Sequence, residues 1–113
     1  MYENKYNWRE AIGQIDPQSE KLITSYVEHC LVKEGQIPRK YKELILMACS
    51  AVLRYGSSVR THGRQAMTLG ASDKEIIEVL SLASLTGGFT AFIEGIESLG
   101  DQLTESQNKN NTS

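Results

Sequence analysis

The sequence lacks the features by which several classes of protein are recognised. Its 12 lysines and arginines are outnumbered by 14 aspartates and glutamates, so the net charge of −2 provides no basic excess for binding nucleic acid. No stretch approaches the roughly 20 apolar residues of a membrane span, and the polar residues 1–5 contain no signal-peptide core. We therefore expect a cytoplasmic protein that binds neither nucleic acid nor a membrane.

Cysteine and histidine are also scarce, which argues against metal and redox centres. Cys30 and Cys49 lie far apart and have neither metal-ligand nor redox spacing, so we expect both to be reduced and buried in the core. His29 and His62 are the only two histidines and share no ligand spacing. The sequence therefore predicts no bound metal and no other cofactor.

Helix start and stop signals recur along the chain, whereas strand signals are absent. Asp16-Pro17 is typical of a helix start, and Ser72 and Glu75 have the spacing of a capping box. With 113 residues, enough for one domain, the pattern predicts an all-α domain of five to six helices in residues 1–103 and a disordered polar tail in residues 104–113. The expected helices cover residues 16–35, 38–56, 57–69, 72–86 and 89–103, with a weaker one near 6–12.

The second of these helices is apolar nearly all round, from Leu44 to Leu53. Such a helix must be covered on every side, and a domain of this size has few elements with which to cover it. The sequence therefore predicts a homo-oligomer in which neighbouring subunits complete the cover.

One narrow stripe of the same helix is polar, because Arg39, Glu43, Met47, Ser50 and Arg54 fall together at 100° per residue. A buried polar stripe either faces a polar cavity or pairs internally. A simple ion pair between Arg39 and Glu43, four residues apart, is the plainer interpretation. A functional site that contains Glu43 is the alternative.

The third expected helix carries three residues that share a face: Tyr55, Ser58 and His62. A lone histidine beside apolar neighbours is more often a core residue than a catalyst. However, an antiparallel return of this helix on the second one can bring His62 close to Glu43. A carboxylate beside an imidazole fixes its tautomer and suits a general acid or base near neutral pH.

The spacing from Glu43 through Tyr55 and Ser58 to His62 resembles the pattern Glu-x11-Cys-x2-Cys-x3-His, with the two cysteines replaced. That pattern is typical of the alkylhydroperoxidase D branch of the carboxymuconolactone decarboxylase superfamily. Ala66, Gly70-Ala71-Ser72, Glu75-Ile76 and Gly87-Gly88 continue the likeness. The resemblance implies an all-α fold and assembly as trimers or hexamers. Tyrosine and serine cannot cycle between thiol and disulfide, so we expect no thiol peroxidase activity.

The chain also departs from the decarboxylase branch, which commonly has a glutamate at the position of Ser58, and from the proline that often follows the glycine pair, where Phe89-Thr90 stands. The resemblance nevertheless implies a cofactor-independent lyase acting on a small carboxylated lactone or a related acid, with His62 and Glu43 as the catalytic acid–base pair. The alternatives are a remnant of the peroxidase branch that binds a small ligand or partner without turnover, and a plain helical assembly module.

Three arginines lie close in sequence to the expected site, and two interpretations remain open for them. Arg60 and Arg64 have no acid nearby with which to pair, so they can form a solvated surface together with Arg54. Alternatively, their guanidinium groups can clamp the carboxylate of an acidic small molecule. The candidate substrate-binding residues are Arg54, Arg60, Arg64, Ser58 and Tyr55.

Overall fold

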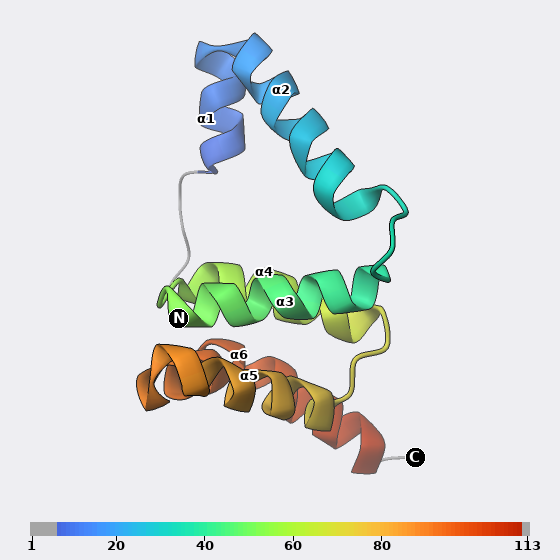
Figure 1. The fold of residues 1–113 in the computed structure, drawn as a ribbon, viewed down its shortest axis with the longest axis vertical. Helices are drawn as coiled ribbons and strands as arrows, with labels where there is room; N and C mark the ends of the chain where they lie inside the picture. Colours follow the sequence, from blue (N-terminus) through green and yellow to red (C-terminus); the bar gives the residue numbers. More distant parts are fainter. Residues whose placement is uncertain (1–6, 112–113) are drawn as a thin grey trace. The chain divides into compact units, whose positions relative to one another are not determined.

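The computed structural model describes the backbone of residues 7–111 and the side chains of residues 7–103. It contains helices and no strand within these residues, as the sequence predicted (Figure 1). Contacts divide the chain into two compact units, and the boundary in the sequence lies between Gln36 and Ile37. The first unit comprises α1 (Trp8–Ile15), α2 (Pro17–Val27) and the π-helix η1 (Glu28–Val32). The second comprises α3 (Arg39–Val52), α4 (Gly56–Thr68), α5 (Asp73–Gly87) and α6 (Phe89–Asn111).

In the first unit, side-chain caps start both α-helices. Asn7 Oδ1 accepts a hydrogen bond from the backbone amide of Arg9 at 2.9 Å, and Asp16 Oδ1 accepts one from Ser19 at 3.2 Å. The single helix predicted up to Gly35 instead ends as α-helix at Val27 and continues as the π-helix η1 to Val32. None of the residues of these three elements is buried.

The second unit is built from two helical hairpins. Helix α3 packs on α4 and α5 packs on α6, while α3 also contacts α5 and α4 contacts α6. Figure 1 shows the two hairpins as successive layers. The core lies between the hairpins, and its fully buried side chains include Met47, Val59, Ile76, Leu80 and Leu99. Buried apolar residues recur at intervals of three and four within single helices, which is why the amphipathic pattern predicted these helices; examples are Leu44, Met47 and Ala51 in α3 and Ile76, Leu80 and Ala83 in α5.

Helix α3 ends earlier than the sequence predicted, at Val52 rather than near Gly56. The reason is Arg54, whose backbone adopts the left-handed conformation with φ of 61°. That conformation is uncommon for residues other than glycine and cannot continue an α-helix. It produces the sharp turn that reverses the chain into α4.

The predicted capping box at the start of α5 is present. Glu75 accepts a hydrogen bond from the backbone amide of Ser72 at 2.9 Å, and Ser72 Oγ accepts one from the amide of Glu75 at 3.1 Å. Lys40 Nζ of α3 lies 3.2 Å from the same carboxylate. The pKa of Glu75 is lowered, chiefly by the hydrogen bond from the amide of Ser72 and secondly by the ammonium group of Lys40. The carboxylate therefore joins α3 to the start of α5.

This lowered pKa predicts a pH-dependent contribution to stability. The contribution is present above the pKa of Glu75 in the unfolded chain and is lost as the pH falls through the lower folded-state value. We expect Glu75→Gln to reduce the urea midpoint of unfolding at neutral pH, and the difference from wild type to vanish in acid. Glu78→Gln, an exposed change on the same helix, is the matched control. Equal effects of both variants at neutral pH would contradict the prediction.

Helix α6 is kinked at Gly100, where the backbone is not helical, and it then continues as helix as far as Asn111. It thus extends beyond Leu103, after which the sequence predicted a disordered tail from residue 104; Thr112 and Ser113 lie outside the described residues. Helical backbone hydrogen bonds form within the segment itself, so a polar sequence can extend a helix without an apolar anchor. Within the described residues, every helix is too short or too polar to cross a bilayer.

One face of α3 has no cover within the second unit. Ile45 is 49% exposed, and an apolar groove of about 810 Å³ runs between α3 and α5. Cys49 lines this groove and is exposed, so the prediction of a core cysteine is wrong here. Cys30 is also exposed, and η1, in which it lies, has no buried residue. The prediction of a core cysteine is therefore wrong for Cys30 as well. Within the described residues, neither cysteine takes part in a disulfide.

Candidate functional site

The hairpin of α3 and α4 brings together the two residues that the sequence paired as a candidate site. His62 Nδ1 lies 2.7 Å from Glu43 Oε1, within a single chain. Glu43 comes from the buried face of α3, and its side chain is only 1% exposed, whereas that of His62 is 22% exposed. The antiparallel return of α4 on α3 thus places a buried carboxylate behind a partly accessible imidazole.

The second oxygen of Glu43 is also occupied. Arg39 Nε donates a hydrogen bond to Glu43 Oε2 at 2.9 Å. The ion pair that the sequence offered as the plainer interpretation and the contact with His62 therefore exist together on one carboxylate. A carboxylate this deeply buried requires such partners, because a charge without them is strongly disfavoured in a protein interior.

The contact with Glu43 defines how His62 can act. A carboxylate only accepts hydrogen bonds, so the geometry assigns the donated proton to Nδ1 of the imidazole. In the neutral ring, Nε2 is then an acceptor, and in the charged ring it is a donor. Glu43 therefore orients the ring and leaves Nε2 as the atom that can exchange a proton with a ligand.

Ser58 takes part in a directed chain of hydrogen bonds. Ser50 Oγ donates to the backbone oxygen of Leu46 at 2.7 Å, and the two serine hydroxyls lie 2.8 Å apart. A carbonyl oxygen cannot donate, so the one hydroxyl proton of Ser50 points to Leu46, and Ser58 must donate to Ser50. Ser58 is thus left with acceptor capacity only. Its proton does not point toward His62, which argues against a serine–histidine nucleophile pair.

Tyr55 stands at the N-cap of α4 and is 52% exposed. Its side chain makes no capping hydrogen bond to the helix. Of the two residues that occupy the cysteine positions of the resembled pattern, Ser58 is joined to the polar stripe of α3 by its side chain, whereas Tyr55 contacts it through its backbone amide. Neither residue provides a thiol.

The three arginines that the sequence grouped do not act as one cluster. Arg60 Nη1 donates to the backbone oxygen of Ser98 at 2.8 Å. Arg54 Nη2 donates to the backbone oxygen of Gly87 at 2.8 Å and to the hydroxyl of Thr90. The guanidinium of Arg54 therefore joins the turn after α3 to the end of α5 and the start of α6. The guanidinium of Arg60 joins α4 to α6.

Arg64 has a different partner again. In the amide orientation that satisfies both groups, the side-chain oxygen of Gln102 accepts hydrogen bonds from Arg64 Nε at 3.0 Å and Nη2 at 3.2 Å. Gln102 is a buried polar residue of α6 that the sequence did not identify. Asp101 precedes it and Leu103 follows it, so its place in the sequence does not disclose a partner so distant.

Gly63, which follows His62, is a second feature that the sequence analysis missed. It is buried, and a Cβ atom at this position would collide with the side chain of Leu99 in α6 and approach that of Met47 in α3. Glycine therefore permits the close packing of α4 that holds His62 against α3. A glycine directly after a candidate histidine was the signal available.

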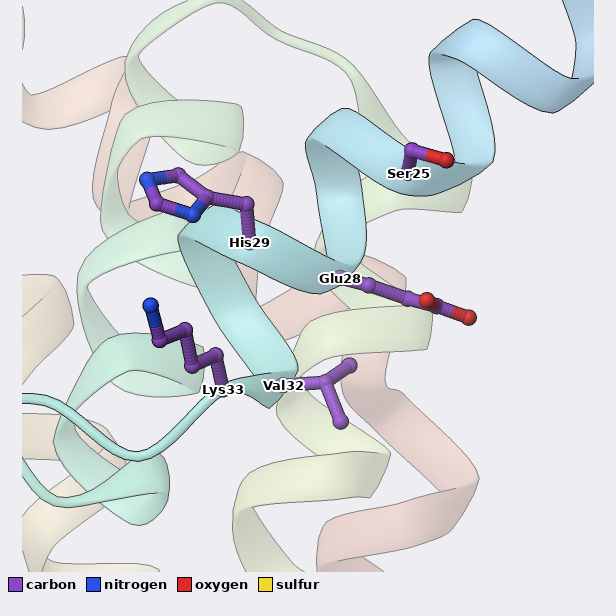
Figure 2. Close-up of a pocket in the computed structure, with 5 residues that line it drawn as sticks. All are labelled: Ser25, Glu28, His29, Val32 and Lys33. Atoms are coloured by element: carbon purple, nitrogen blue, oxygen red, sulfur yellow. The ribbon is translucent and has the colours of Figure 1, made fainter.

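The first unit has a hollow of its own, of about 380 Å³. Figure 2 shows His29 and Lys33 on one side of the helical segment and Glu28 on the other. All of its lining residues come from one continuous stretch of helix, so it is an open groove along a helix rather than a site enclosed by several elements. In the part of the chain that the structure describes, no three His, Cys, Asp or Glu side chains are grouped to hold a metal ion.

Comparison with known proteins identifies a family. The sequence model described as "Carboxymuconolactone decarboxylase family" matches residues 17–99, which is more than half of the chain. No curated protein and no solved structure matches.

Proposed function

Because the chain belongs to the carboxymuconolactone decarboxylase family, we propose that it is a cofactor-independent carboxy-lyase acting on a small carboxylated lactone or a related acid. The observation that carries this proposal is the 2.7 Å contact between His62 Nδ1 and Glu43 Oε1. A buried carboxylate that orients a partly exposed imidazole is the arrangement required of a general acid near neutral pH.

In the proposed reaction, the bond between the substrate carboxylate and its neighbouring carbon breaks, and carbon dioxide leaves. The electron pair of that bond passes into an adjacent carbonyl group as an enolate. The imidazolium of His62 then donates its Nε2 proton to the carbanionic carbon and later regains a proton from water. Glu43 holds Nδ1 throughout and stabilises the charged ring, so it orients the acid rather than transferring the proton itself.

The test is release of carbon dioxide from 4-carboxymuconolactone and a panel of related acids. We expect His62→Ala to lower the rate by about 10²–10⁴-fold, the usual contribution of a positioned acid or base. His29→Ala is the matched control, because it removes the other histidine, on η1. Release that is equally fast in His62→Ala would contradict the proposal.

A second candidate is a protein that binds a small ligand or a partner without turnover. The observation that favours it is the loss of chemistry at the two cysteine positions, since Tyr55 is exposed and Ser58 donates its proton to Ser50. This candidate predicts no carbon dioxide release from any acid in the panel, and binding that survives His62→Ala. Neither candidate includes thiol peroxidase activity.

We further propose that the chain forms a homo-oligomer in the cytoplasm. The support is the uncovered groove between α3 and α5, together with exposed apolar side chains beside it such as Leu53 at 75% and Leu82 at 61%. An exposed apolar groove of this kind is a common mark of a protein–protein contact. Two exposed cysteines that form no disulfide within the described residues fit a reducing compartment.

Light scattering at micromolar concentration tests the oligomer. We expect the mass of a trimer or hexamer for wild type and a smaller mass for Leu82→Glu, which places a charge in the groove. Glu78→Gln, a neighbouring exposed change on α5, is expected to leave the mass unaltered. A monodisperse wild-type monomer would rule out the assembly.

A further inference from the structure

Arg39 differs from the other arginines near the site in how its guanidinium is used. Within the described residues, its only side-chain hydrogen bond runs from Nε to Glu43 Oε2. A guanidinium has five N–H donors, so one donor is engaged and the Nη edge has no acceptor in this part of the chain. The side chain is 37% exposed, so part of it is accessible to a ligand.

The three arginines that follow in sequence are engaged elsewhere. Arg54 and Arg60 donate through their Nη atoms to backbone oxygens, and Arg64 donates to Gln102 through both Nε and Nη2. Using any of them to bind a ligand would break contacts that join α4 or the α3 end to α5 and α6. Arg39 can bind a ligand without losing its bond to Glu43.

We propose that Arg39 is the residue that binds the carboxylate of an anionic ligand beside His62; the inference rests on the proposed function and names the ligand class of that same site. Arg39 and His62 each contact one oxygen of the same carboxylate, so they flank Glu43. Because both side chains bond to the same carboxylate, we expect a ligand carboxylate on the Nη edge of Arg39 to be within reach of the imidazole. The planar guanidinium matches a carboxylate in geometry as well as in charge.

The position of Arg39 in the fold supports an anion at this place. It is the first residue of α3, and Pro38 before it makes no side-chain cap. The first backbone amides of a helix have no partner inside the helix, and the positive end of the helix dipole lies there. Lys40, which follows it, is already paired with Glu75. Arg39 is thus a cationic side chain with donors to spare at this end of α3.

The experiment is a nuclear magnetic resonance titration of the isotope-labelled full chain with sodium acetate. Acetamide, the neutral analogue, and sodium chloride at equal ionic strength are the controls. We expect saturable shifts of the Arg39 Nε–H and His62 ring signals with acetate only. Arg39→Gln is expected to raise the dissociation constant about tenfold or more, as loss of a charge-assisted hydrogen bond requires. Arg60→Gln, the matched control, is expected to leave it unchanged.

Three results would overturn the inference: no saturable shift with acetate, unaltered acetate binding in Arg39→Gln, or an equal loss in Arg60→Gln. Circular dichroism confirms that each variant is folded, and Arg39→Lys, which keeps the charge without the planar fork, is expected to bind with intermediate strength. Acetate binding through Arg39 without carbon dioxide release would remove the proposed lyase but leave this inference standing. Carbon dioxide release with an unchanged KM in Arg39→Gln would do the reverse.

Discussion

Replacing both donors of Glu43, in Arg39→Met/His62→Leu, is expected to destabilise the folded chain by about 3–5 kcal/mol, the usual effect of leaving a buried charge without its partners. Glu43 is 1% exposed, and its two oxygens accept hydrogen bonds from these two side chains. Because each single variant leaves one donor in place, we expect the two single losses to sum to less than the loss in the double variant. Urea unfolding of the four proteins measures this difference.

A third substitution makes the prediction specific to the charge. Adding Glu43→Met to the double variant replaces the carboxylate with an apolar side chain of similar length, and apolar replacements of buried ion pairs are often neutral or stabilising. We expect most of the lost stability to return. If the double variant is as stable as wild type, or if Glu43→Met restores nothing, then the carboxylate is not held in the folded state by these two donors.

This expectation bears on function because a buried ion pair is weak evidence for stability. An apolar residue at position 43 would pack in the core without the desolvation penalty that a carboxylate carries. The structure instead places a carboxylate there and directs one oxygen at His62 Nδ1. The physical effect of that choice is an imidazole of defined tautomer and orientation, which a core residue does not need and a proton donor does. The cost in stability is therefore accounted for by the proposed lyase chemistry.

Much of the fold could be predicted because its signals are local. The caps formed by Asp16 and Ser72 satisfy amides within the next three residues, so sequence alone contains both partners. The apolar residues that include Leu80 in α5 and Leu99 in α6 likewise repeat within a single helix each. The π-helical turn at Glu28–Val32 and the left-handed backbone of Arg54 could not be predicted this way. The residues of that turn are not typical of a π-helix, and arginine is not typical of the left-handed conformation.

The candidate site was only partly predictable for the same reason. Glu43 and His62 were identified from their spacing, which a helical hairpin converts into a contact. The partners of Arg60 and Arg64 lie more than thirty residues away on α6, and no pattern in the sequence specifies them. The role of Arg39 was concealed by a plausible local pair with Glu43, which is real but uses one donor of five. The exposure of Cys49 depends on which face of α3 the other helices leave uncovered.

Restoring the two missing thiols, in Tyr55→Cys/Ser58→Cys, is expected to produce a chain that closes an intramolecular disulfide. Tyr55 is the N-cap of α4 and Ser58 lies in its first turn. A helix N-terminus favours the thiolate, and cysteines separated by two residues at such a position form redox-active pairs. With the two native cysteines, the variant contains four thiols when reduced. We expect two to remain after treatment with diamide.

A thiol assay before and after diamide, with mass spectrometry of the linked peptides, measures this outcome. The matched control is Thr61→Cys/Arg64→Cys, which has the same spacing on the exposed face of α4 but lies beyond the first turn. We expect the control pair to remain reduced under the same conditions. Four thiols in the oxidised test variant, or a link to Cys49, would contradict the prediction. Closure of the pair would show that two side chains, rather than a change in the helical scaffold, separate this chain from the thiol-based pattern that it resembles.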